Sequence, residues 1–145
     1  MARKPAHLLR RRPPFFRPVR LRSRRDGWTI VRQCGFLAAL YLTGSVGTAA
    51  GMIGMSRAGL YRLREREDAT DFARAWDHVL APPGSGRLAR ARVDYRKVTN
   101  DQLLWWIETG RVRPVLYRGK LTAIDRKPDD SALFRLLARS DPRLL

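Results

Sequence analysis

The side chains of this chain best suited to act on a partner are hydroxyls, arginines and a tyrosine gathered between positions 45 and 64. Serine and threonine hydroxyls can donate to phosphate oxygens, and arginine and tyrosine can hydrogen-bond to base edges. Because the spacing places them on the outer side of two short helices, we expect a surface for double-stranded DNA. The residues of this predicted site are Ser45, Thr48, Ser56, Arg57, Ala58, Tyr61, Arg62 and Arg64.

The stretch 46–65 that carries most of these residues is typical of a helix-turn-helix. Its apolar residues recur where two crossed helices would meet, and Ala50 is small where the second helix must approach closely. Gly54 suits a turn with positive φ, and Ser56 can cap the second helix. The recognition helix would then cover about 57–66 and enter a major groove. The alternative is a plain helical hairpin in a core.

Residues that could support catalysis or bind a metal are few. The chain has two histidines and one cysteine, at no spacing that fits a zinc site, a phosphate loop or a nucleophile elbow. Asp125, Asp129 and Asp130 could hold a divalent ion for nuclease chemistry, but a strand-end acid followed by a helix cap is the simpler interpretation. We therefore expect no enzyme, no metal and no cofactor.

The net charge of +17 implies a polyanionic partner, with nucleic acid first and an anionic membrane surface second. Residues 1–26 hold ten Lys/Arg and one acid, whereas residues 27–80 hold six and five. The segment 27–80, which contains the predicted helix-turn-helix, is therefore nearly neutral. The flanking segments supply the electrostatic attraction to a polyanion.

Residues 1–26 also contain four prolines and show no helical or strand period, which predicts a disordered basic arm. Phe15 and Phe16 fit a charged tail poorly: they could dock on the folded part or intercalate at a base step, and we expect docking, or no role, rather than intercalation. The arm would hold DNA phosphates through Arg10, Arg11, Arg12, Arg17, Arg20, Arg22, Arg24 and Arg25.

The 22 residues from Cys34 to Met55 carry no charge and superficially resemble a membrane anchor. A polar TGSVGT sequence lies in the middle of this stretch, where a membrane helix tolerates it least, so we expect no membrane partner. The lone Cys34 excludes an internal disulfide and fits a reducing compartment. These features predict a cytoplasmic, nucleoid-associated protein.

The expected fold is mainly α. A helical domain at 27–81 would begin with a helix over about 30–42, capped by Thr29 and ended by Gly44, and would close with a helix over 71–80. Residues 82–92 have the composition of a linker.

Residues 93–145 predict a small α+β appendage. It would contain a helix from Thr99 to Thr109, a β-hairpin over 114–124 turning at Gly119–Lys120, and a last helix capped by Asp129 or Asp130. So small a unit cannot bury all of its aromatic side chains in a core of its own. We expect it to pack on the helical domain or to mediate self-association into a homo-oligomer.

A series of residues within 27–80 has a family-like order: Trp28, Thr29, Arg32, Gln33, Phe36, Leu37, Ala39, Leu40, residues 43–46, Ala49, Ala50, Ile53, Gly54, Ser56, Arg57, residues 61–64, Phe72, Ala73 and residues 75–77. With this series, residues 27–80 resemble the small helix-turn-helix proteins of bacteria and their prophages, including the terminase small subunit-like group. The resemblance implies DNA binding, as a transcriptional regulator or in phage-like packaging. The alternative is an RNA- or ribosome-associated basic protein in which the helices are scaffold. Ile30 and Gly59 depart from the family pattern.

Overall fold

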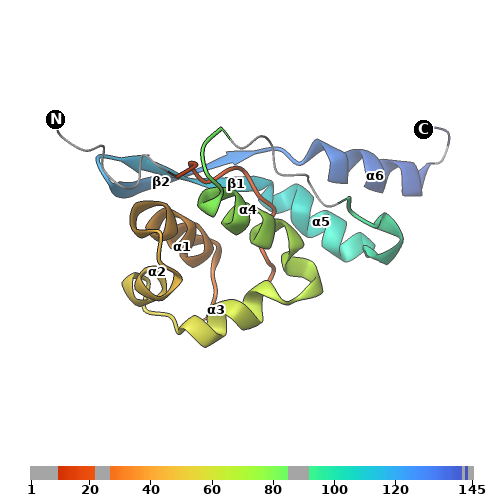
Figure 1. Cartoon of the computed structure of the whole chain (residues 1–145). Coiled ribbons are helices and arrows are strands. Elements are labelled where there is room, and N and C mark those ends of the chain that lie inside the picture. The colour runs from red at the N-terminus through yellow and green to blue at the C-terminus, as the bar shows by residue number, and fades with distance from the viewer. Residues whose placement is uncertain (1–9, 22–26, 85–91, 142, 144–145) are drawn as a thin grey trace.

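The protein is mostly helical and carries one small antiparallel sheet. The computed structural model describes residues 10–21, 27–84, 92–141 and 143. In Figure 1, the first four helices lie beneath a two-stranded hairpin, and the last two helices extend to one side. The elements are α1 (Ile30–Thr43), α2 (Val46–Met52), α3 (Arg57–Arg64), α4 (Thr70–Leu80), α5 (Asn100–Thr109), β1 (Arg111–Tyr117), β2 (Lys120–Lys127) and α6 (Asp130–Ser140).

Helix α1 forms the centre of the main core. Thr29 caps its start by accepting from the Arg32 N–H, and Gly44 ends it with φ 69°, both as the sequence predicts. The ring of Phe36 is fully buried and meets the ring of Trp76 edge-on at 4.8 Å. Within the described ranges no helix is both long and apolar enough to cross a membrane.

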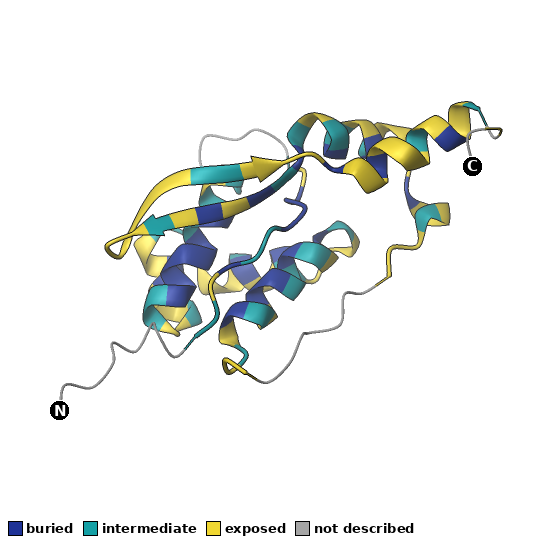
Figure 2. Cartoon of the chain, turned by 90° about the horizontal axis from the view of Figure 1, so that it is seen from above, coloured by how far each residue is buried: buried dark blue, intermediate teal, exposed yellow. Residues whose placement is uncertain are grey.

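Residues 10–21 form an extended strap between the hairpin and the helices (Figure 1). Phe16 and Val112 exchange backbone hydrogen bonds of 2.9 and 3.0 Å, so the strap pairs briefly with β1. The Gln33 side chain binds the N–H and the C=O of Val19 at 2.8 and 2.9 Å, as a neighbouring strand would. Figure 2 shows buried residues along this strap.

The prediction of a disordered arm is therefore wrong for residues 10–21. Phe16 is fully buried and Val19 is 2% exposed, and both belong to the same core as α1. Burial of these side chains, together with the hydrogen bonds to Val112, Gln33 and Asp129, opposes the entropy of ordering the strap. The expected docking of Phe16 is confirmed. Residues 1–9 and 22–26 of the predicted arm lie outside the described residues.

The hairpin belongs to the main core as well. Val112 is fully buried there, and Leu116 and Ile124 pack against it. The predicted packing of the C-terminal segment on the helical unit is confirmed for these strands. The turn differs from the prediction by one residue: Tyr117 pairs with Lys120, which leaves Arg118 and Gly119 as the loop. Their φ values of 50° and 75° fit the turn whose twist matches the strands.

Helices α5 and α6 pack together around a second, smaller core. Its buried residues are Val98, Leu103, Trp106 and Ala132. Thr99 caps α5 by accepting from the Gln102 N–H, and Asp129 caps α6 by accepting from the Ala132 N–H. Local sequence signals therefore located both helix starts correctly.

Candidate nucleic-acid interface

Helices α2 and α3 are joined by a tight turn over residues 53–56. The N–H groups of Ile53 and Met55 both donate to the Ala50 carbonyl, at 3.2 and 3.0 Å, and Gly54 takes φ 73°. Ser56 Oγ accepts from the Gly59 N–H at 2.9 Å and so begins α3. The turn is closed by short-range hydrogen bonds, which explains why the sequence alone predicts it.

The outer face of α3 carries four of the predicted site residues. Leu60 and Leu63 are buried on the inner side of the helix. Residues three and four apart are neighbours on a helix surface, and the structure leaves one such group open to solvent. This outer face consists of the exposed residues Arg57, Ala58, Tyr61 and Arg62.

The Tyr61 side chain of this face packs against the core. Its ring lies 5.4 Å from the ring of Trp76, and the Arg57 guanidinium lies 5.8 Å from the Tyr61 ring. Tyr61 is nevertheless 39% exposed. One side of the ring is therefore fixed by the core, while the rest of the side chain faces solvent with Arg57.

Arg64 does not join this face. Its Nη2 binds the Asp77 carboxylate at 2.8 to 2.9 Å, and its guanidinium lies 4.9 Å from the Trp76 ring. The structure thus places Arg64 in the contact between α3 and α4 rather than beside Arg57.

The predicted hydroxyl donors mark the beginnings of the two helices. Ser45 Oγ accepts from the Thr48 N–H at 3.2 Å, in the same way as Ser56 Oγ accepts at the start of α3. Ser45, Thr48 and Ser56 are all exposed. A hydroxyl that accepts from a helix N–H keeps its own hydrogen for donation, so these groups can still donate to a phosphate oxygen.

Two arginines of the predicted arm are used inside the fold. Arg10 donates to the carbonyls of Tyr41 and Leu42, at 2.6 and 3.0 Å, where α1 ends and its carbonyls lack helical partners. Arg17 donates twice to the buried Asp129 carboxylate, at 2.6 and 3.0 Å. The predicted phosphate contact of Arg17 is therefore wrong, because its side chain is buried and committed to Asp129, whereas the contact of the half-buried Arg10 stays a prediction.

The other predicted arm arginines are more open. Arg20 pairs with Asp101 at 2.9 Å on the surface, and Arg11 donates to the Pro82 carbonyl at 3.2 Å. Arg12 is exposed. Three predicted phosphate contacts, Arg22, Arg24 and Arg25, lie outside the described residues.

Of the histidines and the cysteine, the structure describes Cys34 and His78. Burial raises the pKa of the Cys34 thiol to about 12, with Arg126 acting in the opposite direction, so the thiol stays protonated at neutral pH. Burial, together with Arg11 and Arg74, lowers the pKa of His78. Among the described residues, no group of three or more His, Cys, Asp or Glu could hold a metal ion.

The aromatic residues of the C-terminal segment divide into two groups. Trp106 is buried in the second core, whereas Tyr117 and Phe134 are 62% and 65% exposed. Self-association through such exposed rings stays a prediction that sedimentation can test.

Comparisons of this chain with protein-family models, with curated proteins and with solved structures find no match. The resemblance to small helix-turn-helix proteins therefore stays a prediction that rests on the residues themselves.

Proposed function

We propose that this protein binds double-stranded DNA with α2 and α3 acting as a helix-turn-helix. The observation that carries the proposal is the outer face of α3, where Arg57, Tyr61 and Arg62 stand exposed opposite the buried Leu60 and Leu63. A short helix that is apolar on one side and carries arginines on the other suits insertion into a major groove. Its position after a capped turn fixes the angle at which it projects.

Each side chain of the outer face has a distinct role in this proposal. Arg57 and Arg62 offer paired N–H donors that match the O6 and N7 acceptors of guanine. Tyr61 is held by its contact with Trp76 and presents its hydroxyl to the groove. Ala58 is small enough to let the helix approach the bases. The exposed hydroxyls at the helix starts donate to the backbone phosphates.

The sequence-independent part of the affinity comes from charge outside α3. The outer face is close to the acidic Glu65 and Glu67, whereas the whole chain carries +17. Exposed cations elsewhere include Arg118 and Lys120 at the hairpin turn. Such cations attract any duplex and make binding depend steeply on salt. Transcriptional regulation and phage-like packaging would both use base recognition by α3 together with sequence-independent attraction by cations outside it.

The test compares two double variants of the full chain. R57A/R62A alters the outer face, and R118A/K120A removes two exposed cations from the hairpin turn as the matched control. Both are titrated against a duplex selected from a random pool and against a scrambled duplex, at several salt concentrations. R57A/R62A should reduce discrimination by roughly 1–3 kcal/mol for each lost base contact. The control should keep discrimination and lower only the salt dependence, by about 0.9 in log–log slope per lost phosphate contact.

Two results would reject the proposal. One is unchanged discrimination in R57A/R62A, which would place base reading elsewhere. The other is preferential binding to RNA over every DNA duplex. That result would favour the alternative of an RNA-associated basic protein in which the helices serve only as scaffold.

A further inference from the structure

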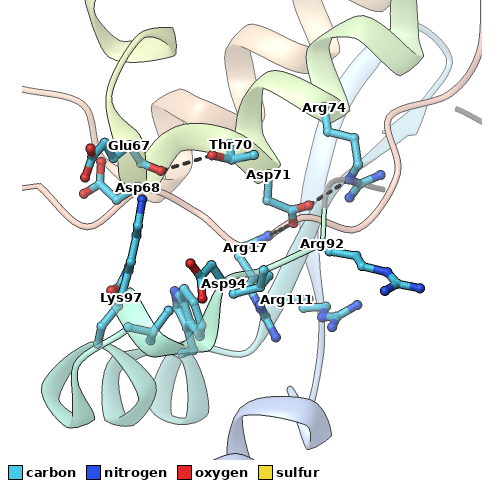
Figure 3. Close-up of a pocket in the computed structure, with 14 residues that line it drawn as sticks. Arg17, Glu67, Asp68, Thr70, Asp71, Arg74, Arg92, Asp94, Lys97 and Arg111 are labelled. Carbon is cyan, nitrogen blue, oxygen red and sulfur yellow. Dashed lines mark hydrogen bonds and ion pairs between the residues drawn. The ribbon is translucent and has the colours of Figure 1, made fainter. Parts of the chain in front are cut away.

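A cavity of about 460 Å³ lies where five segments of the chain meet (Figure 3). Its walls come from the strap, the start of α4 with the turn before it, residues 92–98, α5 and the start of β1. Cavities of about 300–1,000 Å³ are the size of small-molecule sites. The lining residues that matter for its chemistry are Arg17, Glu67, Asp68, Arg74, Arg92 and Arg111.

One wall of the cavity holds a guanidinium with spare hydrogen-bonding capacity. Arg111 Nε is buried and has no hydrogen-bond partner among the residues that the structure describes. The nearest carboxylate is Asp129, whose Oδ1 lies 3.7 Å from Arg111 Nη2. Asp129 already accepts two hydrogen bonds from Arg17 and one from the Ala132 N–H. Two guanidinium groups therefore share one buried carboxylate.

Charged side chains of both signs line the cavity: Lys97 lies on the side of Glu67 and Asp68, and Asp71 and Asp94 lie toward the arginines (Figure 3). In Figure 3, Glu67 and Asp68 lie on the opposite side from Arg74, Arg92 and Arg111. Arg92 makes no ion pair with any other described residue. A buried donor without an acceptor is rare in proteins, and here it coincides with the basic end of an open cavity.

We propose that this cavity binds a small ligand with a phosphate or carboxylate group at one end and hydroxyl or amino groups at the other. Arg111 and Arg92 bind the anionic group, because a guanidinium presents several N–H donors to an oxyanion. Glu67 and Asp68 accept from the hydroxyl or amino hydrogens. Val93, which also lines the cavity, offers the ligand an apolar contact. This site does not depend on DNA binding.

The experiment titrates the full chain, at constant ionic strength, with four probes that separate these contributions. Inorganic phosphate supplies the anion alone, and ribose supplies the hydroxyls alone. Ribose 5-phosphate and gluconate supply both, one with a phosphate and one with a carboxylate. Calorimetry gives the affinities, and the arginine Nε–H signals of a ¹H–¹⁵N spectrum report directly on Arg111. We expect saturable binding of ribose 5-phosphate or gluconate, tighter than that of inorganic phosphate, and no binding of ribose.

Three single variants locate the site. R111Q should weaken binding about tenfold or more, the loss expected for one charge-assisted hydrogen bond, and R92Q should weaken it in the same direction. R118Q, which removes an equal charge from the hairpin turn, should bind as the unaltered protein does. Since Arg17 still holds Asp129 in R111Q, this variant should fold, and a thermal melt checks that it does. R92Q alters an exposed side chain and keeps the test valid if R111Q melts early.

The proposal is overturned if none of the four probes gives saturable binding. It is equally overturned if R92Q and a folded R111Q bind as tightly as R118Q, or if duplex DNA binds while all four probes fail.

Discussion

Two arginine–aspartate pairs in this protein have the same chemistry and very different surroundings. Arg17 and Asp129 are joined at 2.6 Å with side chains 7% and 0% exposed, across 112 positions of sequence. Arg113 and Asp125 are joined at 3.1 Å with side chains 46% and 42% exposed. Exposed pairs contribute little because water screens them, whereas breaking a buried pair leaves a charge without compensation.

The environment of Asp129 also sets how stability depends on pH. Burial alone would raise the pKa of Asp129, but hydrogen bonds and charge from Arg17, the Ala132 N–H and the charge of Arg111 outweigh it, so the pKa is lowered. A carboxyl whose pKa is lower in the folded state stabilises the fold above its unfolded pKa of about 4. That stabilisation is lost as the pH falls from about 4 through the lower, folded value.

We therefore expect D129N to lower the free energy of unfolding by about 3–5 kcal/mol at neutral pH, while D125N lowers it by about 1 kcal/mol or less. Asparagine can still cap α6, so the difference measures the buried pair rather than the cap. Urea unfolding from pH 7 down to pH 3 provides both values and the pH dependence. Between pH 4 and pH 3, D129N should lose less stability than the unaltered protein. Equal losses in the two variants at neutral pH would contradict this account.

Among the helices, the contact between α2 and α3 depends on one small residue. Ala50 is 2% exposed, and its carbonyl holds both N–H groups of the turn. A larger side chain here must push the two helices apart.

A50L should therefore lower the free energy of unfolding by about 1–3 kcal/mol and weaken DNA binding with it. A58L places the same leucine on the outer face of α3. It should leave stability within about 0.5 kcal/mol, as surface substitutions do, while still obstructing the groove contact. Thermal melts and duplex titrations of both variants separate the two effects. An A50L protein with unchanged stability would show that α2 and α3 pack differently.

The elements that the sequence predicts correctly are those whose signals are local. Thr29, Ser45, Ser56 and Thr99 each cap a helix by accepting from an N–H three positions later, so their role is visible within four residues. The hairpin turn was misplaced by one residue because the choice depends on register. An arginine with positive φ, as at position 118, is unusual and gives no signal in the sequence.

The strap and the cavity have no local signal at all. The order of residues 10–21 depends on Val112 and Asp129, roughly a hundred positions away, while its own composition is that of a disordered segment. Arg92 and Arg111 look like ordinary surface charges in sequence and acquire a shared role only when five segments meet. Long-range pairing of this kind cannot be deduced from periodicity.

At the scale of the whole molecule, the predicted boundaries between arm, helical domain and appendage do not separate independent units. Phe16 from the strap, Leu40 from α1 and Val112 from β1 share one core, in line with the expected packing of residues 93–145 on the helical domain. The ring of Phe16 lies 5.8 Å from that of Phe72 in α4. The helices are therefore covered from above by the strap and the hairpin (Figure 1).

This arrangement predicts how fragments of the chain behave. Fragment 27–84 contains α1 to α4 but lacks Phe16, Val19 and Val112, so it should not unfold cooperatively on its own. Loss of a single buried phenylalanine side chain already costs about 3–5 kcal/mol, a large part of the stability of a small domain. Fragment 10–141 retains every core residue of the described structure, and we expect it to fold.

Circular dichroism melts and ¹H–¹⁵N spectra of the two fragments make the comparison. Fragment 10–141 should give dispersed signals and a cooperative melt, and fragment 27–84 neither. Full-length F16A serves as the intermediate case, because it removes one contact of the strap and leaves the covalent chain intact. Its melt should stay cooperative at a lower midpoint. If fragment 27–84 instead melted cooperatively near the midpoint of the full chain, the helices would be an independent domain, and the strap and hairpin would be additions to a core that is already complete.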